Sequence, residues 1–222
     1  MILLFVYSLL YCYYLIQMES TAYTKRLLTY RLSLSHLKEV GLTDVFSYLI
    51  AGETGFSAAL VRKDLAHLKV KGKRRGGYNI DVILDAINKH FGDKEINRVV
   101  LAGMGNIGRA IVNYKDFENR NIKIVAAFDL DPAKQKKKFS IPVFPMSKCR
   151  EIVEEYQVNV AVIAVPAYSA QAVCDQLIQC GVRGIMNFAP KNLKVPDHVY
   201  ISNVRLCDEL QQVIYHSDKA TY

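Results

Sequence analysis

The spacing of hydrophobic positions changes near Arg98. Before this residue, apolar side chains recur every three or four positions, which is typical of amphipathic helices. After it, short apolar runs rich in valine and isoleucine alternate with helical segments. The pattern therefore indicates two parts, built in different ways, within a chain of 222 residues.

The first part has the pattern of a winged helix-turn-helix. Gly41 follows the first predicted helix as a stop, and Ser57 stands where an N-cap residue would begin the third. The basic stretch KGKRRGGY follows that third helix; it is unsuited to a helix interior and is expected to form the wing. The helices themselves are expected over 25–40, 43–51, 58–68 and 81–90.

The second part has the pattern of a parallel sheet with helical crossovers. Strands are expected within residues 98–103, 123–128, 141–144, 158–165, 184–188 and 199–202. Helices are expected over 106–114, 147–156, 169–180 and 207–216. The predicted fold class is therefore α/β, with an N-terminal winged helix-turn-helix, a Rossmann-type parallel-sheet domain and a C-terminal helix.

We expect an apolar extension over 1–24, a winged-helix domain over 25–92, a Rossmann domain over 93–205 and a C-terminal helix and tail over 206–222. The extension opens with an apolar run that stops at Ile16, short of the roughly 20 residues that a spanning helix needs. No Lys or Arg precedes Lys25, so a signal peptide is not indicated. We favour a misplaced start, with translation from Met18, over a membrane anchor.

Cysteine usage indicates a reducing, cytoplasmic setting. The five cysteines form no CxxC pair, so neither a disulfide framework nor a metal site is expected.

Positive charge is concentrated in the winged-helix part. The formal net charge is +8. Residues 25–78 hold eleven basic and four acidic side chains, a net of +7, which is typical of nucleic-acid binding. A solvated basic surface would explain the charges but not their concentration on the third helix and the wing.

Those basic residues define a candidate DNA-binding surface. Arg62 and Lys63 lie mid-way along the third helix, where an arginine can bond guanine in the major groove. Ser57 and the helix N-terminus can contact a phosphate. The wing contributes Lys73, Arg74 and Arg75, which suit the minor groove.

The stretch GMGNIG at 103–108 follows a predicted strand and opens a helix, as a dinucleotide-binding loop does. Gly103 would allow the tight turn, Gly105 the approach of a pyrophosphate, and Gly108 the packing of helix on strand. Asp129, after the next strand, would accept hydrogen bonds from a ribose and favour NAD(H) over NADP(H), with Asp131 as the alternative acid. A Rossmann-like domain with an empty site is the competing interpretation. The other loop residues are Met104, Asn106 and Ile107.

A catalytic constellation is not evident. No histidine follows a core strand, and Lys191 is the only attractive acid–base candidate. The part after the glycine loop leaves little chain for a substrate domain. We therefore expect the cofactor to be a signal and the chain not to be an enzyme, with a small NAD(H)-dependent oxidoreductase as the alternative. The run KQKKK at 134–138 is expected to be a solvated loop.

An ordered set of motifs runs through both parts of the chain. They are VRKDL at 61–65, GKRRGGY at 72–78, the glycine loop with Ala110 and Tyr114, FDLDP at 128–132, IPV at 141–143, AVPA at 164–167, AQAV at 170–173, NFAP at 187–190, VP at 195–196 and EL at 209–210. Through these motifs the chain resembles, from Lys25 to His216, the Rex family of bacterial redox-sensing repressors. The resemblance implies that Tyr114, Val165 and Pro166 join the cofactor site.

The resemblance also implies how such a chain works. It implies a homodimer with a swapped C-terminal helix that binds a palindromic operator. It implies further that NADH releases the DNA and that NAD⁺ competes more weakly, so that the NADH/NAD⁺ ratio sets repression.

Two switch positions depart from the family pattern. The family's aspartate before the last helix is Arg205 here, and the arginine expected on the first helix aligns with Leu32, while Tyr114 remains. One hypothesis is that Arg205 still senses, by repelling the positive nicotinamide of NAD⁺. The other is that the chain is a Rex-like repressor whose NADH response is weakened or lost.

Overall fold

Glycine and proline are absent before Gly41, and one helix, α1 (Ile2–Glu39), fills that stretch. The helix predicted over 25–40 is thus the last part of a longer one. Gly41, at φ +92°, follows its end as expected for a residue that stops a helix.

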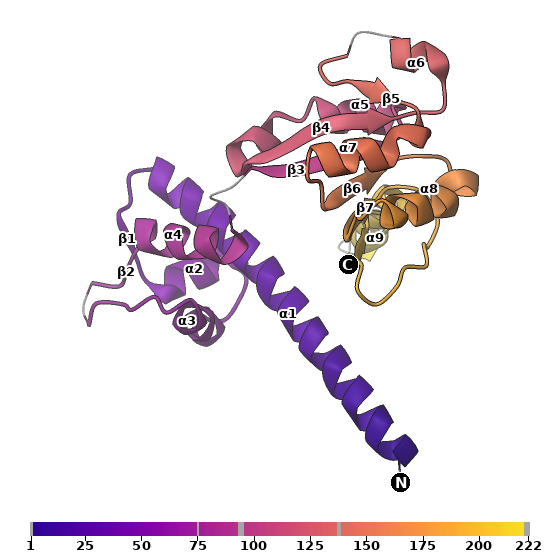
Figure 1. Ribbon diagram of the computed structural model, residues 1–222. Helices are drawn as coiled ribbons and strands as arrows, with labels where there is room; N and C mark the ends of the chain where they lie inside the picture. The colour runs from indigo at the N-terminus through magenta and orange to yellow at the C-terminus, as the bar shows by residue number, and fades with distance from the viewer. Residues whose placement is uncertain (1, 75, 93–95, 137–138, 220–222) are drawn as a thin grey trace. The chain divides into compact units, whose positions relative to one another are not determined.

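The structure is a computed structural model that describes residues 2–74, 76–92, 96–136 and 139–219. The chain divides into two units, Met1–Lys94 and Glu95–Tyr222 (Figure 1). Within the described ranges, no helix combines the length and the apolar character needed to span a membrane.

The first unit packs four helices around one core. After α1 come α2 (Ser47–Thr54), α3 (Ala58–His67) and α4 (Ile80–Phe91). Each helix contributes fully buried side chains, among them Leu27, Tyr30, Leu34, Ile50, Val61, Leu65, Ile83 and Ile87. Because α3 is buried through Val61, Asp64 and Leu65, its remaining face is turned to solvent.

A two-stranded sheet corrects the second predicted helix. Residues Asp44–Val45 form β1, which pairs antiparallel with β2 (Tyr78–Asn79), so α2 begins at Ser47 and not at Thr43. Gly77, at φ +67°, allows this pairing, because a Cβ there would lie 2.5 Å from the Val45 carbonyl oxygen. This long-range pairing overrides the local helical pattern, and the small sheet fixes the base of the wing.

The second unit is built on a parallel sheet of six strands in the order β5-β4-β3-β6-β7-β8, which confirms the Rossmann-type prediction. The strands are β3 (Asn97–Ala102), β4 (Ile122–Phe128), β5 (Val143–Phe144), β6 (Val160–Ile163), β7 (Gly184–Asn187) and β8 (Tyr200–Asn203). Strand order reverses at β3, so the ends of β3 and β6 form the switch point where such sheets bind ligands.

Helices cover the sheet on both faces. They are α5 (Asn106–Val112) and η1 (Lys115–Arg120) on one face, and η2 (Met146–Lys148), α7 (Cys149–Glu155) and α8 (Ala167–Gln179) on the other. The short helix α6 (Pro132–Lys136) follows β4, and its described residues belong to neither core cluster of the sheet. Val100 and Ala102 of β3 share a core cluster with α7 and α8, whereas Val99 and Leu101 share the other cluster with residues of α5. The run KQKKK, predicted to be a loop, lies in α6 up to Lys136, and its positions 137–138 lie outside the described residues.

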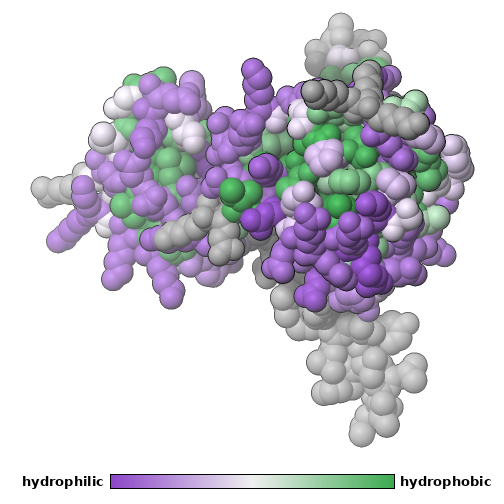
Figure 2. Space-filling model, turned by 45° about the horizontal axis from the view of Figure 1, so that its top comes forward, coloured by the Kyte–Doolittle hydropathy of each residue, from purple (hydrophilic) through white to green (hydrophobic). Residues whose placement is uncertain are grey.

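The last helix, α9 (Leu206–Lys219), leaves apolar side chains uncovered. Figure 2 shows that hydrophobic side chains also gather on the face of the second unit that is in view. On α9 the exposed large hydrophobic residues are Leu206, Leu210, Val213, Ile214 and Tyr215. None of the core clusters formed by the described residues includes a residue of this helix.

Candidate functional site

A cavity of about 790 Å³ opens at the carboxyl ends of the central strands. Its wall includes Gly103, Gly105, Asn106 and Ile107 of the glycine loop, followed by the carboxyl end of β4. The cavity therefore lies at the switch point of the sheet and has a volume typical of small-molecule sites.

The glycines of the loop have distinct roles. Gly103 has φ +99°, and a Cβ there would lie 2.5 Å from the Ala164 carbonyl oxygen. A Cβ on Gly108 would lie 1.9 Å from the Gly103 carbonyl oxygen, so this glycine lets α5 pack against the loop. Gly105 differs, because a Cβ there would meet no atom within 4 Å. Since Gly105 lines the cavity, its missing side chain leaves room for a ligand rather than for the protein.

Asp129 is held as an ionised hydrogen-bond acceptor beside this loop. Its Oδ2 accepts the Met104 N–H at 2.8 Å and the Lys134 ammonium at 3.0 Å, and its Oδ1 accepts the Asp131 N–H at 2.9 Å. Burial by itself would raise the pKa of the Asp129 carboxyl, but these donors outweigh it and lower the pKa below its ordinary value. The carboxylate is therefore charged throughout the neutral range.

The structure brings most of the predicted cofactor residues together. Asp131, Val165 and Pro166 line the cavity together with Asp129 and the loop. Met104 and Gly108 do not line the cavity, because both are buried behind the loop. Tyr114 does not line it either; it lies on the exposed surface with its ring centroid 5.0 Å from that of Phe117.

Sequence reasoning did not assign several wall residues. The sequence predicts a solvated loop at Lys134, yet its position five residues after Asp129 brings the two side chains together across the start of α6. Tyr168 begins the exposed edge of the wall at the first turn of α8 and is 87% exposed. Phe188 and Pro190 of the NFAP motif also line the cavity, although the sequence does not predict a place for them in the site. The other unassigned wall residues include Leu130, Met146, Ser169, Val173 and Gln176.

Arg205 lies behind the wall and is not among the residues that line the cavity. Its Nη1 donates to the Ala189 carbonyl oxygen at 2.6 Å and its Nη2 to Asn192 Oδ1 at 2.8 Å. In the second unit, the predicted switch residue is thus bound to the connection between β7 and β8.

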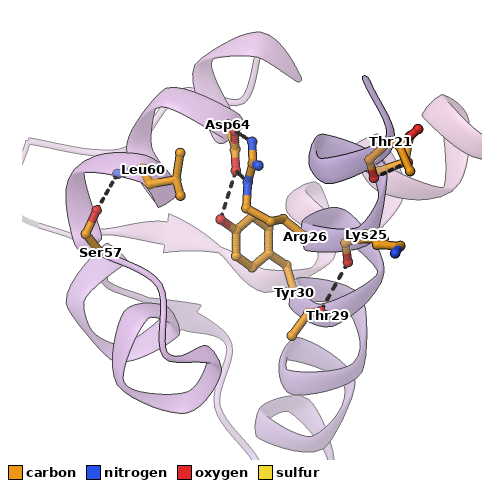
Figure 3. Close-up of polar contacts among 9 residues, drawn as sticks. Thr21, Lys25, Arg26, Thr29, Tyr30, Ser57, Leu60 and Asp64 are labelled. Carbon is orange, nitrogen blue, oxygen red and sulfur yellow. Dashed lines mark hydrogen bonds and ion pairs between the residues drawn. The ribbon is translucent and has the colours of Figure 1, made fainter. Parts of the chain in front are cut away.

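The candidate DNA-binding surface lies on α3 and the wing. Ser57 caps α3 by accepting the Leu60 N–H at 3.2 Å, as the sequence predicts (Figure 3). Arg62 and Lys63 are exposed, and Arg62 Nη1 lies 3.2 Å from Ser47 Oγ at the start of α2. These two cations therefore occupy the solvent face of the capped helix.

The wing is a tight turn. The Lys73 N–H donates to the Gly77 carbonyl oxygen at 2.7 Å, and the Lys73 ammonium lies 3.6 Å from Asp44 Oδ1. Arg74 is exposed at its tip. Arg75, the third predicted wing residue, lies outside the described residues.

A buried polar cluster holds the inner face of α3. Asp64 accepts hydrogen bonds from Arg26 and Tyr30 of α1 (Figure 3). The hydrogen bond to Asp64 raises the pKa of the Arg26 guanidinium. Burial, followed by the hydrogen bond to Asp64, raises the pKa of the Tyr30 hydroxyl. Both α1 residues therefore stay protonated and continue to donate.

Leu32, the other predicted switch position, is 63% exposed on α1. The guanidinium of the neighbouring Arg31 lies over the Phe91 ring, 5.5 Å from the centroid. On α1 the switch position is thus an exposed apolar side chain.

Fold and site together define a chain that joins a winged helix-turn-helix to a Rossmann unit with a dinucleotide-type loop. A family model described as a CoA binding domain matches residues 93–191. Proteins named redox-sensing transcriptional repressor Rex are 39% identical over 195 residues in Listeria welshimeri, covering 87% of this chain and 91% of the relative. In Pelotomaculum thermopropionicum the identity is 40% over 192 residues, covering 86% of this chain and 90% of the relative. The chain belongs to the Rex family.

Solved structures agree with this family membership. A crystal structure of RSP in complex with β-NAD⁺ and operator DNA is similar with a TM-score of 0.83 and 28% identity, covering 90% of this chain and 93% of that one. The structure of RSP in complex with β-NADH has a TM-score of 0.80 and 27% identity, covering 90% and 94%. The relatives are transcription regulators, and the family membership extends over both units.

Proposed function

We propose that this chain is a transcriptional repressor that binds an operator, senses the ratio of NADH to NAD⁺ and releases the DNA when NADH binds. One observation carries the proposal: a single chain of the Rex family combines a glycine-loop cavity beside an ionised carboxylate with a capped helix whose exposed face is basic. RSP, the related chain, has been solved with β-NAD⁺ and operator DNA and with β-NADH.

The residues of the cavity fit a dinucleotide. The space at Gly105 would admit the pyrophosphate against the loop backbone, and Asp129 would accept hydrogen bonds from the adenosine ribose. A 2′-phosphate would meet the negative charge of Asp129, which favours NAD(H). The bound cofactor supplies no chemistry in this role; the chain responds to its presence and redox state.

The DNA contacts follow from α3 and the wing. Arg62 and Lys63 would enter the major groove, Ser57 and the start of α3 would face a phosphate, and the wing with Lys73, Arg74 and Arg75 would reach the minor groove. A repressor of this kind acts on the chromosome, so we place it in the cytoplasm.

Dimer formation would cover α9. Its exposed leucine, valine and isoleucine side chains form an apolar surface that the second unit leaves uncovered. A second copy that receives this helix would bury it, and a two-fold dimer would match a palindromic operator. The functional domains in this proposal are residues 25–92 for DNA, 93–205 for NAD(H) and 206–222 for the dimer.

Release requires only a difference in affinity. If NADH binds the free form more tightly than the DNA-bound form, then NADH shifts the population toward free protein. A hundredfold preference corresponds to about 2.7 kcal/mol.

The test is a titration of the full chain on DNA. An operator is first selected from random-sequence DNA by repeated binding to the protein. Fluorescence anisotropy of this operator is then followed while NADH or NAD⁺ is added at one fixed salt concentration. Release at lower NADH than NAD⁺ supports the proposal. Failure to enrich any DNA, or sustained consumption of NADH with a substrate, would overturn it.

A weakened NADH response is the second candidate, favoured by the exposed Leu32 and by Arg205 bound to the β7–β8 connection. Tight DNA binding that neither cofactor changes would select this candidate. The repressor would then remain and the sensor would be lost.

A further inference from the structure

Arg205 bonds two separate elements of the second unit. Its guanidinium bonds the connection between β7 and β8, at Ala189 and Asn192, and its own carbonyl oxygen accepts the Glu209 N–H at 3.0 Å in the first turn of α9. One residue thus bonds both the start of the exposed helix and the segment that carries the wall residues Phe188 and Pro190. Among the described residues, no carboxylate forms an ion pair with this guanidinium.

The bonded segment is itself firmly shaped. Asn187 is fully buried, and its Oδ1 accepts the Ala189 N–H at 2.9 Å. Its Nδ2 donates to the Lys191 carbonyl oxygen at 2.9 Å and to Asn203 Oδ1 at 2.8 Å. The hydrogen bonds of the buried Asn187 side chain therefore fix the turn at 187–191. They hold the Ala189 carbonyl in the position where Arg205 bonds it.

The same turn forms part of the cavity wall. Phe188 and Pro190 line the cavity, whereas Ala189 between them is buried away from it. A ligand in the cavity would contact Phe188 and Pro190, which flank the Ala189 carbonyl that is bonded to Arg205. The bond of 2.6 Å between charged donor and carbonyl is of the strong, charge-assisted kind.

We propose that Arg205 is a positioning residue that connects the wall segment 187–192 to α9, so that occupation of the cavity is transmitted to the dimerisation helix. We call this connection, from Ala189 and Asn192 through Arg205 to the start of α9, the latch. The latch rests on the proposed function, because the ligand is the dinucleotide and the helix is the surface that a second copy covers. Arg205 bonds the wall segment on the side that faces away from the cavity. The latch differs from a charge that faces the nicotinamide, because Arg205 does not line the cavity.

The test separates geometry from charge. Arg205→Lys keeps the positive charge but cannot reach both acceptors as the planar guanidinium does. Asn192→Ala removes one acceptor at an exposed position without altering Arg205. The matched control is Arg98→Ala, an exposed arginine near the amino end of the central strand β3, whereas the cavity lies at the carboxyl ends of the strands. Thermal unfolding of each full-length variant checks that it folds.

Hydrogen–deuterium exchange of the full chain, with and without NADH, gives the readout. In the wild type we expect NADH to slow exchange in peptides covering 187–193 and to change exchange in 206–215. In Arg205→Lys we expect the α9 response to fall at least about fivefold and the affinity for NADH and NAD⁺ to weaken together by about tenfold. Asn192→Ala should give a smaller change in the same direction, and Arg98→Ala none.

The outcomes distinguish the latch from a direct action of the Arg205 charge on the cofactor and from a failure of the proposed function. If both latch variants match Arg98→Ala in affinity and in α9 exchange, the latch is wrong. If Arg205→Lys is unchanged and Arg205→Gln gains affinity for NAD⁺ alone, the charge acts on the cofactor directly and the latch is also wrong. If the wild type binds neither cofactor, the proposed function fails. The latch is then judged without cofactor, where Arg205→Lys must still speed exchange in both peptides.

Discussion

Arg26 of α1 and Asp64 of α3 form a two-point ion pair, with Nε 2.7 Å from Oδ2 and Nη2 2.9 Å from Oδ1. Tyr30, one turn further along α1, donates to the same Oδ2 at 2.9 Å. Asp64 is 1% exposed, so its charge depends on these partners. The pair holds the buried face of α3 against α1 (Figure 3). Arg62 and Lys63 remain on the solvent face of α3.

Arg26→Ala should therefore destabilise the first unit strongly. It leaves the Asp64 carboxylate buried without a cation, and breaking a buried pair in this way costs about 3–5 kcal/mol. Urea unfolding of the full chain, followed at two wavelengths because two units are present, measures the loss. Lys38→Ala is the control, since its pair with Asp81 is exposed on both sides. Equal effects of the two variants would show that burial of Asp64 does not matter.

Arg62 and Lys63 should affect DNA binding in different ways. If Arg62 contacts a base, Arg62→Ala weakens binding to the selected operator by about 1–3 kcal/mol and relaxes the sequence preference of the protein. If Lys63 contacts a phosphate, Lys63→Ala weakens all sequences alike and lowers the salt slope by about 1. Anisotropy at several salt concentrations separates the two effects. Lys89→Ala, an exposed lysine on α4, is the charge-matched control and should change neither quantity.

Local signals in the sequence were sufficient for much of this fold. Ser57 was predicted as an N-cap and caps α3, because the rule depends only on the residues that follow it. The glycine loop was equally predictable, since turn, strand and helix are contiguous. The alternating sheet followed from the spacing of apolar runs. The cap, the loop and each single strand or helix of the sheet are encoded within about a dozen residues.

Features that join distant segments were not predictable. β1 pairs with residues more than 30 positions later, and only that pairing makes Asp44–Val45 extended. The partner of Asp64 is 38 residues away, and the acceptors of Arg205 lie across a strand. Lys134 was missed for a different reason: a lysine-rich run is usually solvated, and only the turn into α6 directs this one to Asp129. The cofactor and DNA residues that were named remain predictions.

Asp129→Asn should weaken the binding of NADH and reduce the preference for NADH over NADPH. The amide loses the charge that strengthens the ribose hydrogen bonds, so NADH affinity should fall about ten- to a hundredfold. Because the amide no longer repels a 2′-phosphate, the preference for NADH over NADPH should shrink. Fluorescence titrations with NADH and with NADPH measure the two affinities. Asp131→Asn is the control, and a larger effect there would make Asp131 the ribose acceptor.

The pH dependence of stability should also trace to Asp129. The pKa of the Asp129 carboxyl is lowered in the folded state, so this carboxylate stabilises the fold fully above the unfolded pKa of about 3.9. That contribution is lost as the pH falls through the folded pKa. The difference in unfolding midpoint between wild type and Asp129→Asn should thus be constant from pH 5 to 8 and shrink below about pH 4. A difference that instead changes between pH 6 and 8 would assign the effect to another group.

Two glycine variants should separate the fold from the cofactor site. Gly108→Ala places a methyl group 1.9 Å from a backbone carbonyl oxygen, so the loop must shift and the second unit should lose stability. Gly105→Ala places its methyl group in open space beside the cavity, so stability and operator binding should stay at wild-type values. Because that methyl group takes the space left for the pyrophosphate, NADH affinity should fall about tenfold. The Gly105 variant should therefore repress at NADH concentrations that release the wild type. If it instead binds NADH normally, the ligand does not approach the loop at Gly105.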